Sequence, residues 1–439
     1  MVEKVQKAFR NPNAIISMIA VLLVAVLCQS SGAESPALEY MAQEFTELPF
    51  STVLLVTTIC SVMMIPSALI FPFLRKKLSF RTIFIAASVL LICGGVMPAF
   101  TPYGPGAFEF VLGWRCVFGF GMGIMWPLAQ AMIVEFYDGQ TQNTLLGFNS
   151  VVTACGGIMW ANVGGQLALQ GWRMSFFCYF IPIAILVFCA IFIPNERARK
   201  QAEAQDAAGL AGFNEAEALE EAMTSNKSKF LMLTIAIMVL YFLFNACNMV
   251  YFTNLSPKVI GEGIGDSGTA GLAQSCFTIG SLIIGVIFGK VMTNKTLDRW
   301  ALGGGLILVG VGALIVAQST NFPLLAAGSI IQGFGTGTVM PTFIGIFGSL
   351  AGKKNAAMIL GIGSCLAGAS QYFGPMMFNV LAESMGLAAG SPTMLFAAIG
   401  HLVLAVITVV VIAIKGKPGT AARKVVEAKK AEYLAQQQG

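Results

Sequence analysis

The sequence predicts an all-α polytopic membrane protein with twelve transmembrane helices. Of its 439 residues, 56% are hydrophobic and 11% are charged, whereas a soluble globular domain has roughly 25% charged residues. Apolar runs of about 20 residues recur along the chain, which is the length that a helix needs to cross a bilayer core. These features exclude a soluble enzyme, a disordered protein and a disulfide scaffold. The length of the runs also excludes a transmembrane barrel.

Proline, glycine or charged residues separate successive apolar runs, so each run is predicted to be one helix. The first run follows a basic segment and is longer than the core of a signal peptide, so we expect it to be retained as a span. The predicted spans, in order, are residues 14–34, 51–72, 81–100, 108–133, 145–168, 174–193, 230–252, 268–290, 299–318, 323–349, 356–380 and 393–415.

The basic residues set the predicted orientation. When both termini are placed in the cytoplasm, all of the 26 Lys and Arg except Arg115, Arg173 and Lys258 lie in cytoplasmic loops, turns or termini. Such a bias is typical of membrane proteins, whose cytoplasmic loops are enriched in Lys and Arg. We therefore expect a multi-pass protein of the plasma (inner) membrane with both termini cytoplasmic.

A polar insert and an internal repeat divide the chain into two halves. The predicted units are an N-terminal six-helix bundle (1–193), a cytoplasmic central loop (194–229), a C-terminal six-helix bundle (230–415) and a cytoplasmic tail (416–439). The run GFGMGIMWP at 119–127 matches GFGTGTVMP at 333–341 at every Gly and Pro. Because repeated halves around a midplane site are typical of secondary transporters, the repeat favours transport.

Three short stretches carry a family resemblance. Residues 115–123 read RCVFGFGMG and resemble an RxxqGxgxg motif in the fourth helix of the major facilitator superfamily. Residues 171–173, GWR, resemble its entry to the sixth helix, and residues 35–38, SPAL, resemble its SPALP-type exit from the first. The chain is similar to this family over all but its tail. The resemblance implies two pseudo-symmetric six-helix bundles that rock around a central cavity.

Two motifs of the family are altered here. The loop between spans 2 and 3 lacks the usual acid and keeps Arg81, so Glu135 or Asp138 is expected to pair with Arg81 at the inner gate.

Gly119 and Gly333 are expected to let helices approach closely while the gates exchange. Span 5 lacks a Gly-Pro kink that the family associates with drug/proton antiport, which favours symport or uniport.

Charged residues within the hydrocarbon are costly and are functional candidates by default. Arg115 lies about two turns into span 4, and Glu34 lies at the outer end of span 1. In the family both spans face the cavity, so the two residues could meet and serve proton coupling or anion binding. The alternative is that Arg115 bonds carbonyls of span 1 as a structural residue and that Glu34 is solvated.

Polar side chains form stripes on the predicted helices. Tyr241, Asn245 and Asn248 are spaced i, i+4, i+7 and share one face of span 7, which lines the cavity in the family. The other predicted cavity residues are Gln29, Asn162, Gln332 and Gln371. Hydrogen bonding between helices is the alternative role for each of them.

Together these features predict a secondary active transporter without a P-loop. The favoured function is proton-coupled symport of an organic anion; efflux of amphiphilic drugs by antiport, or uniport, are the alternatives. A membrane-embedded enzyme or a channel is disfavoured because neither converging catalytic groups nor a filter loop is seen. The expected partners are a small-molecule substrate, protons and the lipid bilayer, with no nucleic acid, cofactor or metal, and the protein is expected to act as a monomer. The ten Cys and the single His, His401, are expected to be structural.

Overall fold

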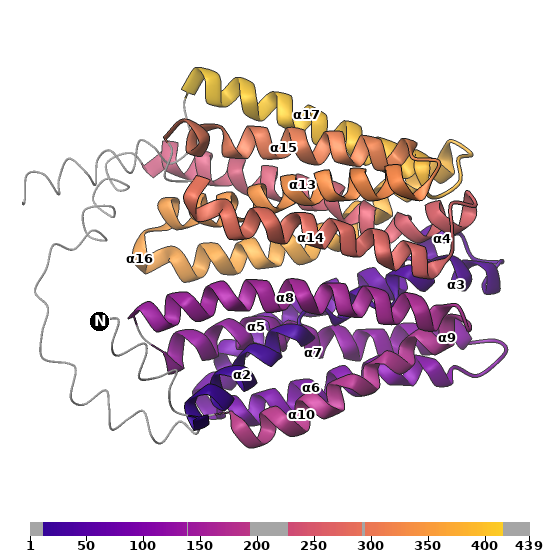
Figure 1. Ribbon diagram of the computed structural model, residues 1–439, viewed down its shortest axis with the longest axis horizontal. Helices are drawn as coiled ribbons and strands as arrows, with labels where there is room; N and C mark the ends of the chain where they lie inside the picture. The colour runs from indigo at the N-terminus through magenta and orange to yellow at the C-terminus, as the bar shows by residue number, and fades with distance from the viewer. Residues whose placement is uncertain (1–11, 138, 194–226, 292–294, 416–439) are drawn as a thin grey trace, which may run out of the picture.

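The computed structural model describes residues 12–137, 139–193, 227–291 and 295–415, and this part of the chain is helical and contains no β-strand. The long helices run along one common axis (Figure 1). The first half contains α2 (Pro12–Leu27), η1 (Ser30–Gly32), η2 (Ser35–Ala37), α3 (Leu38–Glu44), α4 (Phe50–Val53), α5 (Leu55–Lys77), α6 (Phe80–Val96), η3 (Met97–Phe100), α7 (Ala107–Phe136), α8 (Gly139–Ala168), α9 (Trp172–Ser175), η4 (Phe176–Phe180) and α10 (Ile181–Phe192). The second half contains α13 (Lys227–Gly261), α14 (Ser267–Val291), α15 (Lys295–Gln318), α16 (Phe322–Ser384) and α17 (Ser391–Lys415).

Ten helical segments of the described residues are long and apolar enough to cross a bilayer. Predicted spans 145–168 and 356–380 are not among the ten, although both are helical in the structure. Glycines and amides such as Asn149 and Asn162 lower the mean hydropathy of span 145–168. This span belongs to α8, which packs against α2 and α14. The all-α membrane fold is confirmed, while the count of twelve spans stays a prediction.

The predicted break between spans 10 and 11 is a reversal inside one continuous helical stretch, α16. A Cβ placed on Gly363 would lie 3.3 Å from the Phe347 ring. In a straight helix these residues would be about 24 Å apart, at a rise of about 1.5 Å per residue. The chain therefore folds back between them, and the two arms of α16 are antiparallel.

Two predicted helix ends are wrong. Span 7 was expected to end at 252, but α13 continues to Gly261 and takes Lys258 into the helix. Span 1 was expected to be continuous to 34, but α2 ends at Leu27 and is followed by two short 3-10 turns. The Ser30 hydroxyl donates to the Leu27 carbonyl at 2.7 Å, and hydroxyl groups that bond the backbone in this way compete with helix. We call residues 28–37 the break segment.

The apolar cores divide at the position of the predicted central loop. One core contains residues 18–193 only, and two others contain residues 237–412 only. The repeated glycines have equivalent surroundings: a Cβ on Gly119 would collide with the Cys60 carbonyl of α5, and one on Gly333 with the Phe277 carbonyl of α14. The division into two bundles stays a prediction, because 194–226 and the tail, 416–439, lie outside the described residues.

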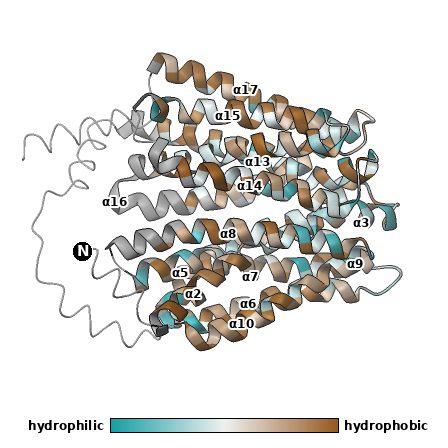
Figure 2. Ribbon diagram, in the orientation of Figure 1, coloured by the Kyte–Doolittle hydropathy of each residue, from teal (hydrophilic) through white to brown (hydrophobic). Residues whose placement is uncertain are grey.

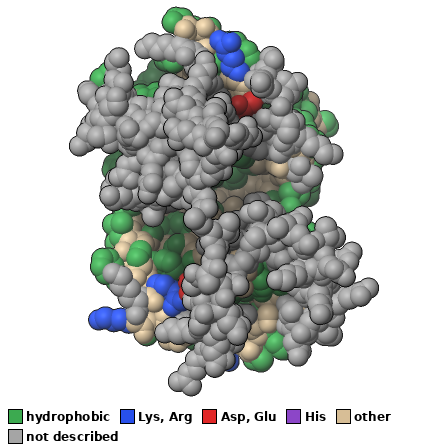
Figure 3. All heavy atoms as spheres, turned by 90° about the vertical axis from the view of Figure 1, so that its left-hand side faces the viewer, with side chains coloured by type: hydrophobic (Ala, Val, Ile, Leu, Met, Phe, Trp, Pro, Cys, Tyr) green, Lys and Arg blue, Asp and Glu red, His purple; other side chains and the backbone are tan. Residues whose placement is uncertain are grey.

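The two ends of the bundle carry different charges. Figure 2 shows apolar residues along the helices, with polar ones toward the helix ends, including the end near α3 and α9. At that end, which we call the acidic end, exposed carboxylates include Glu44, Glu47, Glu109, Glu262 and Asp266. At the opposite end, where α2 begins and α17 ends, described charged residues include Arg75, Lys77, Arg81 and Arg299. We call this the basic end, and Figure 3 shows Lys and Arg side chains on both halves of it.

Candidate functional site

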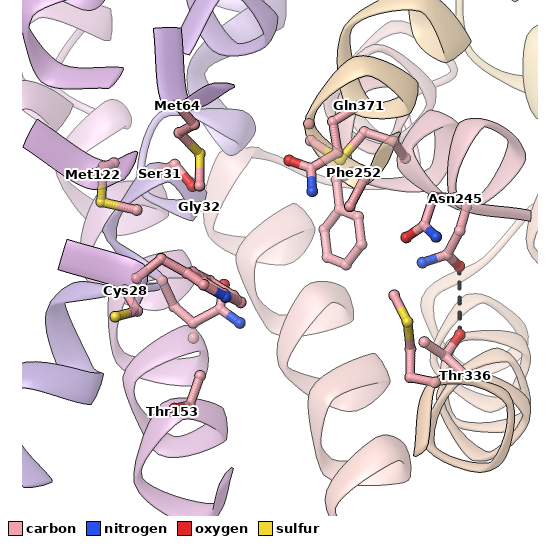
Figure 4. A pocket seen from close by; sticks show the side chains of 18 of the residues that line it. Cys28, Ser31, Gly32, Met64, Met122, Thr153, Asn245, Phe252, Thr336 and Gln371 are labelled. Carbon is pink, nitrogen blue, oxygen red and sulfur yellow. Dashed lines mark hydrogen bonds between the residues drawn. The ribbon is translucent and has the colours of Figure 1, made fainter. Parts of the chain in front are cut away.

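A cavity of about 510 Å³ lies between the two halves. Its walls come from the break segment, α5, α7 and α8 on one side, and from α13, α14 and α16 on the other. Figure 4 shows side chains of both halves directed toward the open space between them. Five of the predicted cavity residues line it: Gln29, Tyr241, Asn245, Asn248 and Gln371.

Asn162 and Gln332 were expected to line this cavity, and in the structure they do not. The Asn162 amide donates to the Ile158 carbonyl and to Ser275 Oγ, so its side chain spans the α8–α14 contact. The Gln332 amide donates to Asn248 Oδ1 from behind the wall, at 3.4 Å. Both residues act between helices, the role that was left open as the alternative.

Sequence reasoning missed a polar stripe on α14. Gln274, Thr278 and Ser281 all line the cavity, and their i, i+4, i+7 spacing is the same as the spacing that identified the stripe on α13. Trp126 also lines the cavity, with 39% of its surface exposed. Trp160, by contrast, is a packing residue, because it is buried and its Nε1 donates to the Val26 carbonyl.

Internal hydrogen bonds fix the direction of three cavity amides. The Asn245 Nδ2 donates to the Tyr241 carbonyl at 2.8 Å, which leaves the Asn245 oxygen available. The Asn248 oxygen accepts from Gln332 Nε2 and Thr336 Oγ1, each at 3.4 Å. The Gln371 oxygen accepts from Ser61 Oγ at 3.0 Å. Asn248 and Gln371 are thus left with amide N–H groups to offer.

None of the described residues that line the cavity carries a charge. Glu34 is adjacent in the chain to the lining residue Ser35 and pairs with Arg115, and both side chains of this pair are 0% exposed. The sequence-based expectation was that these two residues could meet, and the structure places them in direct contact. Their role in coupling or binding stays a prediction.

Glu34, Arg115 and Tyr179 form a sealed cluster. Arg115 Nη2 donates to Glu34 Oε1, and Arg115 Nε donates to the Val56 carbonyl at 2.9 Å. The Tyr179 hydroxyl lies within hydrogen-bond distance of Glu34 Oε2 and of the Ser30 carbonyl. The guanidinium also lies above the Phe118 ring, with its Cζ 4.1 Å from the ring centroid. The motif at 115–123 therefore supplies the positively charged partner of a buried ion pair.

The break segment separates this cluster from the cavity. Gln29, Ser31, Gly32 and Ser35 line the cavity, whereas Ser30 and Glu34 are fully buried on the other side. Short 3-10 turns allow this change of face from one residue to the next, because a 3-10 helix has three residues per turn. The carboxylate is one residue away from the cavity wall.

Among the described residues, seven hydrogen bonds join the two halves, and all seven lie toward the acidic end. Both the Ser51 amide and its hydroxyl donate to Glu383, each at 2.8 Å. The Ser256 hydroxyl donates to the Pro36 carbonyl at 2.7 Å and accepts from the Glu39 amide. The remaining three bonds are Ser61–Gln371, Asn162–Ser275 and Ser267–Gly165.

The predicted ion pair at the basic end has a different partner. Glu135 was expected to pair with Arg81, but it accepts from Arg75 Nη2 at 2.6 Å. Arg75 reaches Glu135 because it lies on α5, which packs along α7, whereas Arg81 is exposed at the start of α6. Asp138, the other expected partner, lies outside the described residues.

Lys258 is a buried charge that sequence analysis placed in a loop. Its Nζ donates to Glu262 Oε2 at 3.0 Å, the Ala317 carbonyl at 3.1 Å and Ser391 Oγ at 2.6 Å. These bonds tie α13 to the ends of α15 and α17. His401 is buried on α17 and packs edge-on against Phe244, away from the cavity lining.

Comparison with known proteins places this arrangement in a family. The sequence model of the Major Facilitator Superfamily matches residues 18–265 and 237–436. The uncharacterized MFS-type transporter YceJ of Bacillus subtilis (strain 168) is 24% identical over 284 residues, which cover 59% of this chain and 67% of that protein.

Solved structures share the fold. The inward open conformation of the xylose transporter XylE from E. coli has a TM-score of 0.70 and 15% identity, covering 90% of this chain and 95% of that one. A POT family transporter in complex with a thioalcohol conjugated peptide has a TM-score of 0.68 and 12% identity, covering 91% and 96%. The family match spans most of the chain, so the protein belongs to the major facilitator superfamily and is a multi-pass membrane transporter.

Proposed function

We propose that this protein is a proton-coupled secondary transporter that works as a monomer by alternating access. The basic end is cytoplasmic in this proposal, since cytoplasmic loops of membrane proteins are enriched in Lys and Arg. The membrane is the plasma (inner) membrane, and both termini are cytoplasmic. The solute enters the cavity between the halves, and the Glu34 carboxylate carries the proton.

The observation that carries the proposal is the position of the Glu34–Arg115–Tyr179 cluster. It lies directly behind the break segment, whose other side lines the cavity. Protonation of Glu34 would remove the negative partner of a fully buried guanidinium and so change the most favourable arrangement of the cluster. Because the break segment carries Glu34 and also contacts the cavity, a rearrangement on one side is transmitted to the other.

The contacts between the halves support alternating access. The hydrogen bonds that join them lie toward the acidic end, which in this orientation closes the outer side. The similarity to an inward open structure of XylE supports the same state for this chain. In the opposite state the bonds of Ser51 and Ser256 to the other half would break, and the basic ends would approach.

The sequence-based expectation of an organic anion depended on Arg115 as its binding group. Arg115 is buried and already paired with Glu34, which supports a role in coupling rather than in solute binding. Uniport needs no proton gradient, and antiport moves the solute in the direction opposite to the proton. One transport assay therefore separates both from symport.

The test is uptake into proteoliposomes with an alkaline interior. The solute is the compound that most raises the melting temperature of the purified protein in a thermal-shift screen. Wild-type protein should accumulate it above the outside concentration, whereas Glu34→Gln should only equilibrate it while counterflow exchange persists. Glu47→Gln, at an exposed acid of the acidic end, is the matched control and should behave as wild type.

Persisting counterflow shows that the Glu34→Gln protein is folded and still carries solute. Uphill accumulation by this variant would overturn the coupling role. Wild-type uptake that does not depend on the proton gradient would indicate uniport. Efflux driven by inward proton flow would indicate antiport.

A further inference from the structure

The chemistry of the cavity wall identifies the class of solute, and this inference rests on the proposed transport function. Most polar side chains of the wall are amides or hydroxyls, with amides at Gln29, Asn245, Asn248, Gln274 and Gln371. A cavity of about 510 Å³ is in the usual size range of small-molecule sites.

The three amides with fixed directions present a defined pattern. Asn248 and Gln371 use their oxygens within the protein, so they offer N–H donors to a ligand. Asn245 donates one N–H to the Tyr241 carbonyl, which directs its oxygen away from that bond and offers an acceptor. In Figure 4 the Gln371 nitrogen points toward the space between the halves. A matching solute carries at least two acceptors and one donor.

Part of the wall is apolar and aromatic. Phe252 and Phe277 both line the cavity and meet edge to face, with ring centroids 5.1 Å apart. Met64 and Met122 lie on the opposite half, and Phe252 projects between the halves (Figure 4). Flexible thioethers and aromatic rings favour an apolar or ring-shaped portion of the solute.

A charged solute would find no counterion among the described residues that line the cavity. An ionised group that leaves water without a partner of opposite charge loses far more solvation than neutral dipoles return. Arg115 and Glu34 are sealed from the cavity and neutralise each other. We propose that the cavity binds a solute without net charge that has hydrogen-bonding groups on one side and an apolar or ring-shaped portion on the other.

The test uses probes in matched sets of three that share a skeleton. One set is 3-phenylpropanamide, 3-phenylpropanoate and 3-phenylpropylammonium, and the other is glucose, glucuronate and glucosamine. Each probe is titrated at neutral pH, without a gradient, while the melting temperature of the purified protein is recorded. The neutral member of at least one set should bind saturably and at least tenfold more tightly than either charged member. Tighter binding of a charged member, or no saturable binding of any neutral member, would overturn the inference.

A designed charge sharpens the test. In Gln371→Glu the new carboxylate can still accept from Ser61 and places a negative charge on the wall. The preference should shift at least tenfold toward the ammonium member. Gln170→Glu, exposed and outside the lining, is the control and should keep the neutral preference. If Gln371→Glu leaves the preference unchanged, the probes bind elsewhere and the inference fails.

Failure of this inference and failure of proton coupling are distinguishable. The binding titration involves no gradient and no Glu34 variant, so a neutral preference can hold even where Glu34→Gln still accumulates solute. Conversely, if a charged probe binds more tightly than the neutral one, the uptake assay with Glu34→Gln can still show proton coupling.

Discussion

Replacing Glu34 by Gln should destabilise the protein because of the charge it leaves behind. Arg115 is fully buried, and its carboxylate partner is Glu34. Breaking a buried ion pair by removing one partner costs about 3–5 kcal/mol. Arg115 keeps the Val56 carbonyl at 2.9 Å and the Tyr179 oxygen at 3.4 Å, so we expect a loss near the lower end, about 3 kcal/mol.

A double-mutant cycle isolates the pair. Arg115→Gln leaves the carboxylate with Tyr179 as its remaining side-chain partner and should also cost about 3 kcal/mol or more. The double variant Glu34→Gln/Arg115→Gln buries two neutral amides that can bond each other. It should therefore lose no more than either single variant, giving a coupling energy of about 3 kcal/mol.

The assay is chemical unfolding in detergent followed by circular dichroism, with Glu47→Gln as a control expected within about 0.5 kcal/mol of wild type. If the two single losses add to the double loss within about 0.5 kcal/mol, the groups do not interact energetically. The reasoning about the buried pair would then be refuted.

Three further predictions concern the halves and helix ends. Glu383→Gln weakens the bonds from Ser51 at the acidic end by about 1–2 kcal/mol and should speed amide hydrogen exchange there; unchanged exchange would exclude a closing role. Gly119→Val places a side chain against α5 and should lower the free energy of unfolding by about 3 kcal/mol. An unfolding free energy equal to that of wild type would contradict the close packing. Hydrogen bonds from Thr269 lower the pKa of Asp266; this stabilisation is present above the ordinary carboxyl value and lost as pH falls through the lowered one. The melting temperature should therefore exceed that of Asp266→Leu at neutral pH, and the difference should shrink in acid.

The fold was largely predictable because apolar length and loop charge are strong signals. The failures came from local chemistry within the apolar runs. The first helix ends at Leu27, whose carbonyl accepts from the Ser30 hydroxyl, whereas the predicted span continued to residue 34. Lys258 was placed in a loop because a charge usually ends a span, yet three hydrogen bonds retain it inside α13.

The site was predictable where spacing alone decides which residues share a face. Tyr241, Asn245 and Asn248 were found in this way, and Gln274 with its stripe on α14 was available by the same rule. Asn162 was misplaced because spacing gives a face but not the direction of that face around the helix axis. Only packing partners settle that direction, as the contact with α14 shows.

The absence of net charge on the proposed solute has an energetic consequence for transport. With one proton and a neutral solute per cycle, one positive charge crosses the membrane, so a membrane potential drives uptake without a pH gradient. Each 100 mV contributes about 2.3 kcal/mol per charge, which is about 50-fold in accumulation. A potassium diffusion potential, negative inside, imposed on proteoliposomes at equal pH should therefore drive uphill uptake by wild type and not by Glu34→Gln. A monovalent anion carried with one proton would respond to the pH gradient and not to the potential. Accumulation that follows pH alone would thus contradict the neutral solute while preserving the proton site.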